Sequence, residues 1–193
     1  MATGDSVYSP RFIRGLEVAV RLHASQARKG SGVPYVSHLL GACSIALDYG
    51  ADEDTAIAAL LHDAIEDVEP TALARAAVAS FGERVLATVE AVTDADTHPK
   101  PPWRERKERF VASLAGADAA ALLVSGADKL HNARSLLADL RRDGASVWDR
   151  FNATREDTLW YYRATIAAMR ANPAHDRYLV EEVERVLNEV ERT

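Results

Sequence analysis

The chain has 193 residues, a formal net charge of −6, 48% apolar residues and one cysteine. This length suits one domain with its own core, and the apolar fraction excludes an intrinsically disordered chain. No apolar run is long enough for a membrane span, and the first ten residues lack the basic and apolar segments of a secretory signal. We therefore expect a cytoplasmic protein with no membrane partner. The acidic balance gives no support for a nucleic-acid partner.

Apolar residues recur at three- and four-residue spacing through most of the chain, which predicts an all-α fold. Ser37 is the expected N-cap of the second helix and Gly50 its stop, while Asp52 or Asp54 caps the third. Cys43 lies among small and apolar residues, so we expect it to be buried packing rather than a nucleophile. The expected helices cover residues 10–26, 37–50, 52–67, 71–80, 83–93, 103–114, 119–140, 147–169 and 176–190.

Residues 94–103 contain three prolines and cannot form a regular helix, so we expect a mobile loop beside the site, in which His98 is not a ligand. Residues 121–124 could form a strand, but β-branched residues are few there and a helix is favoured. We expect a flexible tail over residues 1–9 and a single domain over 10–193, whose last helix lies within 174–192.

The most informative stretch is residues 58–67, which read AALLHDAIED. On a continuous helix, His62 would lie over Glu66 and Asp63 over Asp67, because positions four apart share a face. Burying four ionisable groups on an apolar helix costs several kcal/mol for each unpaired charge. A bound metal cation is the simplest compensation, so this stretch predicts a metal site.

His38 and Asp128 are the distant residues that could complete such a site between facing helices. Taken alone, His38 is better explained as a structural residue of the core. Two imidazoles and two carboxylates form a mixed nitrogen and oxygen set that suits Mn²⁺, Mg²⁺, Fe²⁺ or Zn²⁺. With a single cysteine, the chain cannot form a thiolate zinc site.

Four motifs occur in order: RKGSGVPYVSH, AALLHDAIED, FGERV followed by VEAVTD, and ADKLHNARSL. Together they resemble the HD-domain hydrolases of the RelA/SpoT group, and among these the small stand-alone alarmone hydrolases that include the metazoan SpoT homologue. The resemblance covers roughly residues 10–170. It implies a single-domain helical bundle of the HD type and hydrolysis of the 3′-pyrophosphate of guanosine tetra- or pentaphosphate, (p)ppGpp, to GDP or GTP and pyrophosphate.

The resemblance also implies roles for individual residues, with Mn²⁺ as the expected cofactor and other divalent ions as alternatives. The family often has a lysine two or three residues before the metal aspartate, but this chain has Val-Ser-Gly at positions 124–126. Lys129 is our own candidate to replace that lysine. The family also often has proline where this chain has Leu39. The implied metal ligands are His38, His62, Asp63 and Asp128, the catalytic acids Glu66 and Asp67, and the substrate-binding residues Arg28, Lys29, Ser31 and Asn132, together with Lys129.

Several alternatives stay open. The site could belong to a nucleotide or NADPH phosphatase, or to a catalytically dead nucleotide-binding module. A homo-oligomer is possible, and we expect the synthetase half of the long bifunctional enzymes to be absent. We expect His23 and His131 to pack around the ligands rather than bind metal. A second basic group either binds phosphate or forms a solvated helix face: Lys100, Arg104, Arg106 and Lys107.

Overall fold

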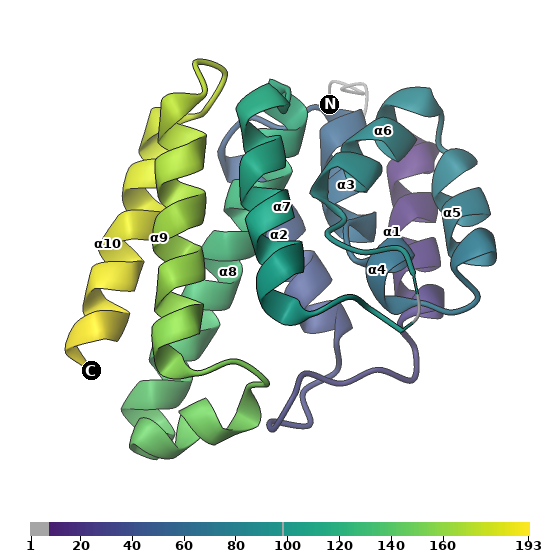
Figure 1. Cartoon of the computed structure of the whole chain (residues 1–193). Coiled ribbons are helices and arrows are strands. Elements are labelled where there is room, and N and C mark those ends of the chain that lie inside the picture. Colours follow the sequence, from purple (N-terminus) through teal and green to yellow (C-terminus); the bar gives the residue numbers. More distant parts are fainter. Residues whose placement is uncertain (1–7, 98) are drawn as a thin grey trace, which may run out of the picture.

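A computed structural model describes residues 8–97 and 99–193, so residues 1–7 of the expected tail and His98 lie outside the described residues. Within this part of the chain the regular elements are helices, with one isolated bridge between Ala27 and Pro34. The all-α prediction is confirmed. The elements, shown in Figure 1, are α1 (Pro10–Leu22), α2 (Val36–Asp48), α3 (Glu53–Leu61), α4 (Ala64–Asp67), α5 (Thr71–Ala79), α6 (Glu83–Val92), α7 (Trp103–Ser113), the 3₁₀ helix η1 (Leu114–Gly116), α8 (Ala119–Asp143), the 3₁₀ helix η2 (Gly144–Arg150), α9 (Arg155–Ala171) and α10 (Arg177–Arg192).

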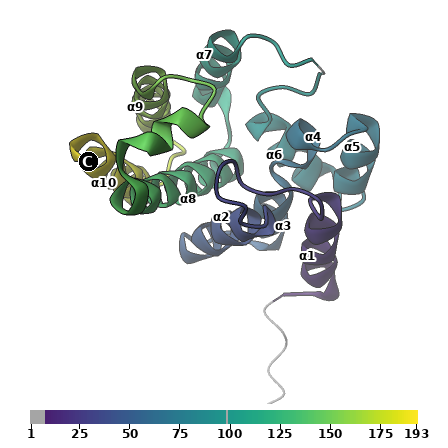
Figure 2. The ribbon, with the colours of Figure 1, turned by 90° about the horizontal axis from the view of Figure 1, so that it is seen from below.

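The long helix α8 is the centre of the arrangement. It packs against α2, α3 and α6 on one side and against α10 on the other, and α9 packs between α10 and α7. Figures 1 and 2 show α9 and α10 at one edge of the molecule and α1 and α5 at the opposite edge. None of the helices in the described ranges has the length and apolar character needed to cross a membrane.

Local sequence explains where several helices begin. Asp52 is the N-cap of α3, and its Oδ1 accepts a hydrogen bond from the Thr55 N–H at 3.0 Å. Asp118 caps α8 in the same way. After its polar first turn, α3 is wholly apolar and buried, as a helical segment without a polar face must be. Cys43 is buried, as expected, and burial raises the pKa of its thiol to about 11.

The expected cap at Ser37 is wrong. Tyr35 already has helical backbone angles, and α2 begins at Val36 with no side-chain cap. The Ser37 N–H donates to the Pro34 carbonyl at 3.0 Å, so this serine lies inside the first turn. Gly50 follows the end of α2 with φ of +85°, a conformation that glycine adopts at low cost.

The predicted continuous helix over 52–67 is also wrong, because it is interrupted at His62 and Asp63. Nδ1 of His62 lies 2.9 Å from the Ala59 carbonyl oxygen, so the side chain competes with the backbone for this acceptor. In an α-helix, neighbouring side chains diverge by about 100°. The interruption instead lets both residues face one point, with His62 Nε2 only 3.1 Å from Asp63 Oδ2.

The helix predicted over 147–169 begins later than expected. Residues 144–150 form η2, and α9 starts at Arg155 after its N-cap, Thr154. The Thr154 hydroxyl oxygen accepts from the Asp157 N–H at 3.1 Å. This Thr-x-x-Asp spacing is a helix-start signal that the aromatic periodicity of residues 148–162 had hidden. The end of α9 before Asn172-Pro173 agrees with the prediction.

Candidate active site

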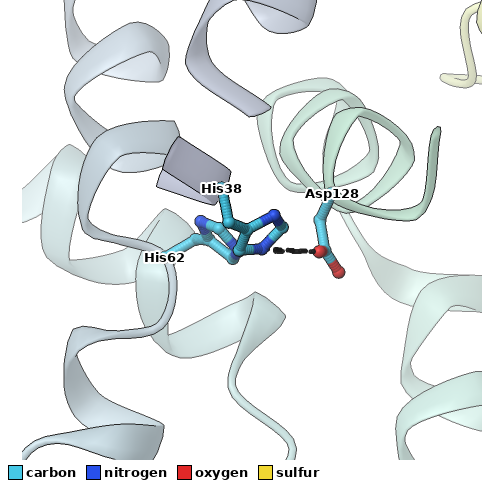
Figure 3. Close-up of side chains that lie close together, drawn as sticks. All are labelled: His38, His62 and Asp128. Carbon is cyan, nitrogen blue, oxygen red and sulfur yellow. Dashed lines mark hydrogen bonds and ion pairs between the residues drawn. The ribbon is translucent and has the colours of Figure 1, made fainter. Parts of the chain in front are cut away.

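Four side chains from three separate segments converge between α2, the α3–α4 break and α8. His38 comes from α2 and Asp128 from α8, and donor atoms of His38, His62 and Asp128 all lie within 4.8 Å of one another. Nε2 of His38 lies 3.2 Å from Nε2 of His62 and 3.2 Å from Oδ1 of Asp128. Asp63 Oδ2 is 3.4 Å from the same nitrogen. Figure 3 shows both imidazoles turned toward Asp128.

The donor chemistry of this cluster fits a divalent cation. Nδ1 of His62 faces a carbonyl oxygen, which can only accept, so the proton of the neutral ring is on Nδ1 and Nε2 presents a lone pair. That lone pair points at a second imidazole nitrogen and at two carboxylates. Acceptors facing one another in a buried space need a positive charge between them.

The ionisation of the surrounding groups points the same way. Burial alone would raise the pKa of Asp128, but the Lys129 ammonium and hydrogen bonds from both histidines hold it well below its ordinary value. Asp63 is likewise kept ionised despite burial by His62 and His38. Burial would lower the pKa of His62, yet these two carboxylates raise it well above the usual value, so without a cation the ring holds a second proton on Nε2, where a metal would take its place. The two buried carboxylates therefore favour a positive charge in this cluster.

The two further acids, Glu66 and Asp67, lie on the short helix α4 beside this cluster. Lys100 Nζ is 2.9 Å from Glu66 Oε1 and 2.8 Å from Asp67 Oδ1. Burial, followed by the nearby Asp94 carboxylate, raises the pKa of Glu66 to about 7, and Lys107 opposes this shift. A carboxyl group that titrates near neutrality is suited to exchanging protons.

The loop over residues 27–35 covers the other side of the cluster. Its Arg28 donates to Asn132 Oδ1 at 2.8 Å, and the Asn132 amide in turn donates to Asp128. Gly30 has φ of +72°, and a Cβ there would lie 2.4 Å from Cδ of Arg150. The loop therefore packs directly on the Arg150 side chain, which is itself ion-paired with Asp139 and Asp143.

All eleven residues predicted for the site line one cavity of about 490 Å³. Its charged lining comprises seven Lys and Arg and six Asp and Glu side chains, in a chain whose net charge is −6. A divalent cation at the cluster would make this cavity clearly positive. The arrangement suits an anionic ligand. The eleven residues are Arg28, Lys29, Ser31, His38, His62, Asp63, Glu66, Asp67, Asp128, Lys129 and Asn132.

The second basic group divides into two parts. Lys100, Arg106 and Lys107 line the cavity, and the last two hold the buried carboxylate of Asp94. Arg104 does not line it. Its guanidinium lies 3.3 Å from the centre of the Trp160 ring and is ion-paired on an exposed face. For this arginine the solvated-face interpretation is correct.

Two of the cavity's polar residues that were not predicted from the sequence lie beside the proposed acids and metal ligands. Tyr35 donates from its hydroxyl to Asp63 Oδ2 at 2.7 Å and lies 3.4 Å from Asp67 Oδ2. Asp94 is the carboxylate that helps to raise the pKa of Glu66. Both lie within the quoted motifs, at the end of the glycine-rich loop and in VEAVTD, so their position there was the available signal.

The two remaining buried or half-buried histidines near the site contact its residues. His131 Nδ1 is 2.9 Å from His38 Nδ1. His23 Nδ1 is 2.6 Å from Gln26 Oε1, and its ring stacks on Tyr35 with 5.2 Å between centroids. Both contacts are with residues that surround the cluster, and the expectation that these histidines pack around the ligands stays a prediction.

Comparison with known proteins identifies the family to which this cluster belongs. Residues 15–159 match the family described as HD domain. The chain belongs to the HD-domain family. One HD-domain relative is the guanosine-3′,5′-bis(diphosphate) 3′-pyrophosphohydrolase MESH1 of Xenopus tropicalis, 40% identical over 140 residues that cover 71% of this chain and 73% of the relative. Another is the probable GTP pyrophosphokinase of Mycobacterium leprae, 37% identical over 124 residues.

The part of each relative's length that the match covers differs between these two proteins. The match covers 64% of this chain but only 15% of the mycobacterial protein. A solved structure of a metazoan orthologue of SpoT, described as hydrolysing ppGpp, superposes with a TM-score of 0.77 at 25% identity. That similarity covers 96% of this chain and 98% of the solved chain, so it includes the helices that carry the cluster.

Proposed function

We propose that this HD-domain protein hydrolyses the 3′-pyrophosphate of (p)ppGpp, giving GDP or GTP and pyrophosphate. One observation carries the proposal: the four candidate metal donors, the acid pair and the Arg28–Lys29 loop line the same cavity. Similarity to enzymes named for this reaction supports it. In the reaction, water adds to the phosphorus next to the ribose, and the bond from that phosphorus to the 3′-oxygen breaks.

In this proposal His38, His62, Asp63 and Asp128 hold the metal, and Mn²⁺ is the expected ion. A divalent cation in such a site supplies Lewis acidity, lowering the pKa of water and neutralising charge on phosphate. The Tyr35 hydroxyl keeps Asp63 directed at the histidines through its 2.7 Å hydrogen bond. Lys129 and Asn132 both donate to Asp128, which fixes that carboxylate while they face the substrate.

Glu66 is the proposed general base. Its pKa of about 7 balances ionisation against basicity at neutral pH. Lys100 lies in the irregular segment between α6 and α7, and its ammonium contacts both acids. As a substrate phosphate arrives, the Lys100 ammonium is placed to bind it beside these acids. Asp67, beside the proposed base on α4, is assigned to orienting the attacking water.

The opposite end of the cavity is proposed to bind the nucleotide. Arg28 is held by Asn132, so its planar guanidinium is preorganised to stack on the guanine ring. Lys29 and Ser31 add an ammonium and a hydroxyl donor on the same loop. The cations of the cavity hold the substrate against the negative charge of the whole protein.

Product identity tests the proposed function. After chelation and reloading with Mn²⁺, we expect ppGpp to yield GDP and pyrophosphate, while nucleoside monophosphates and NADPH react more slowly. The chelated protein without added ion should be inactive. Release of orthophosphate alone would favour a nucleotide or NADPH phosphatase. Absence of any turnover with every ion tested would favour the regulatory module.

The raised pKa of Glu66 predicts a particular pH profile. Because the base acts only when ionised, kcat/KM for ppGpp should rise with pH below about 7 and level off above it. A bound cation favours the carboxylate, so the midpoint should lie at or somewhat below 7. Steady-state rates between pH 5 and 9 measure this limb, and its persistence in Glu66→Gln would assign it to another group.

A further inference from the structure

We infer that His131 is a positioning residue that fixes His38 as a metal ligand, and that Gly41 provides the space that this requires. The inference rests on the metal centre of the proposed function. It concerns a contact between α2 and α8 that involves no substrate. His131 lies three residues after Asp128, so α8 carries both a proposed ligand and the group that supports another.

The hydrogen-bond chemistry assigns the direction of this support. Nε2 of His38 faces His62, Asp63 and Asp128. A neutral histidine that gives its Nε2 lone pair to a cation carries its proton on Nδ1 and needs an acceptor there. The group at that position is Nδ1 of His131, 2.9 Å away. His131 must therefore accept through Nδ1 and carry its own proton on Nε2.

The contact between His131 and His38 requires a residue without a side chain at position 41. A Cβ on Gly41 would lie 2.1 Å from Cδ2 and 2.2 Å from Nε2 of His131. These distances are far inside van der Waals contact, so no other residue at position 41 permits the present ring position. Gly41 is in α2, three residues after His38, where glycine is otherwise unfavourable by about 1 kcal/mol relative to alanine. The glycine makes room for the ring against the helix backbone.

The first test measures Mn²⁺ affinity of the purified, chelated protein by calorimetry, without substrate. We expect His131→Ala to weaken Mn²⁺ binding about 10- to 100-fold, the usual cost of losing a group that supports a ligand. His131→Asn should restore most of the affinity, because its amide oxygen can accept from His38 Nδ1. His175→Ala, which removes a histidine bonded to the Asn172 carbonyl near α10, should bind like the wild type.

The second test separates positioning from general damage to the fold. Gly41→Ala should also weaken Mn²⁺ binding in the wild-type background, but should have little further effect in His131→Ala, because the ring it displaces is gone. Unchanged affinity in His131→Ala would overturn the inference, as would equal losses from Gly41→Ala in both backgrounds. A wild type that binds no Mn²⁺ would overturn the proposed metal centre as well.

Discussion

Asp63→Ala should abolish both Mn²⁺ binding and turnover of ppGpp. The substitution removes a carboxylate whose Oδ2 lies 3.1 Å from His62 Nε2 and 3.4 Å from His38 Nε2. The metal contributes several kcal/mol of charge stabilisation in such reactions, and each 1.36 kcal/mol is a factor of ten. We therefore expect kcat/KM to fall by at least about a thousandfold. His62→Ala should have the same effect.

Thermal unfolding distinguishes loss of the ion from loss of the fold. In the wild type, free Mn²⁺ at 100 times its Kd should add about 2.7 kcal/mol of stability over the chelated protein. In Asp63→Ala this increment should vanish. Asp48→Ala, which removes an exposed carboxylate from the end of α2, is the matched control and should keep it. Full activity in Asp63→Ala would refute the proposed ligand set.

Glu66→Gln should leave Mn²⁺ bound and lower kcat by about 10²- to 10⁴-fold, the contribution expected of a general base. Glutamine keeps the shape of the side chain but cannot take a proton. Lys100 would retain Asp67 as its partner at 2.8 Å, so the cavity should keep its form. Single-turnover rates and Mn²⁺ calorimetry on the same preparation provide the two measurements.

Asp67→Asn is the comparison for this prediction. Because Asp67 is assigned to orienting water, its loss should reduce kcat without removing the rising limb of the pH profile. If instead Asp67→Asn removes that limb and Glu66→Gln retains it, the two roles are exchanged. A Glu66→Gln variant with wild-type kcat would exclude this residue as the base.

The helical fold was predictable because apolar periodicity and capping residues are local properties of the sequence. The central helix α8 and the cap at Asp52 agree with prediction. The interruption at His62 was not predictable in this way. At the interruption, the His62 imidazole contacts the Ala59 carbonyl oxygen. Helix propensities do not include such side-chain competition for a backbone acceptor.

The site was predictable in its residues more than in its geometry. Eleven side chains that line the cavity were named from the sequence, but the assumed stacking of His62 on Glu66 and of Asp63 on Asp67 along one helix was wrong. Sequence spacing does not reveal contacts made across the fold, such as Tyr35 with Asp63 or His131 with His38. It also did not distinguish Arg104, which packs on Trp160, from its neighbours that face the cavity.

The contact between Gly30 and Arg150 has a consequence for how substrate preference changes within this architecture. The proposed ion ligands are anchored in α2, α8 and the α3–α4 break, whereas the loop bearing Arg28 rests on a side chain from η2. Under the proposed function, substitutions in η2 would shift the loop that binds the nucleobase and leave the metal ligands in place, so substrate preference could change without loss of hydrolysis.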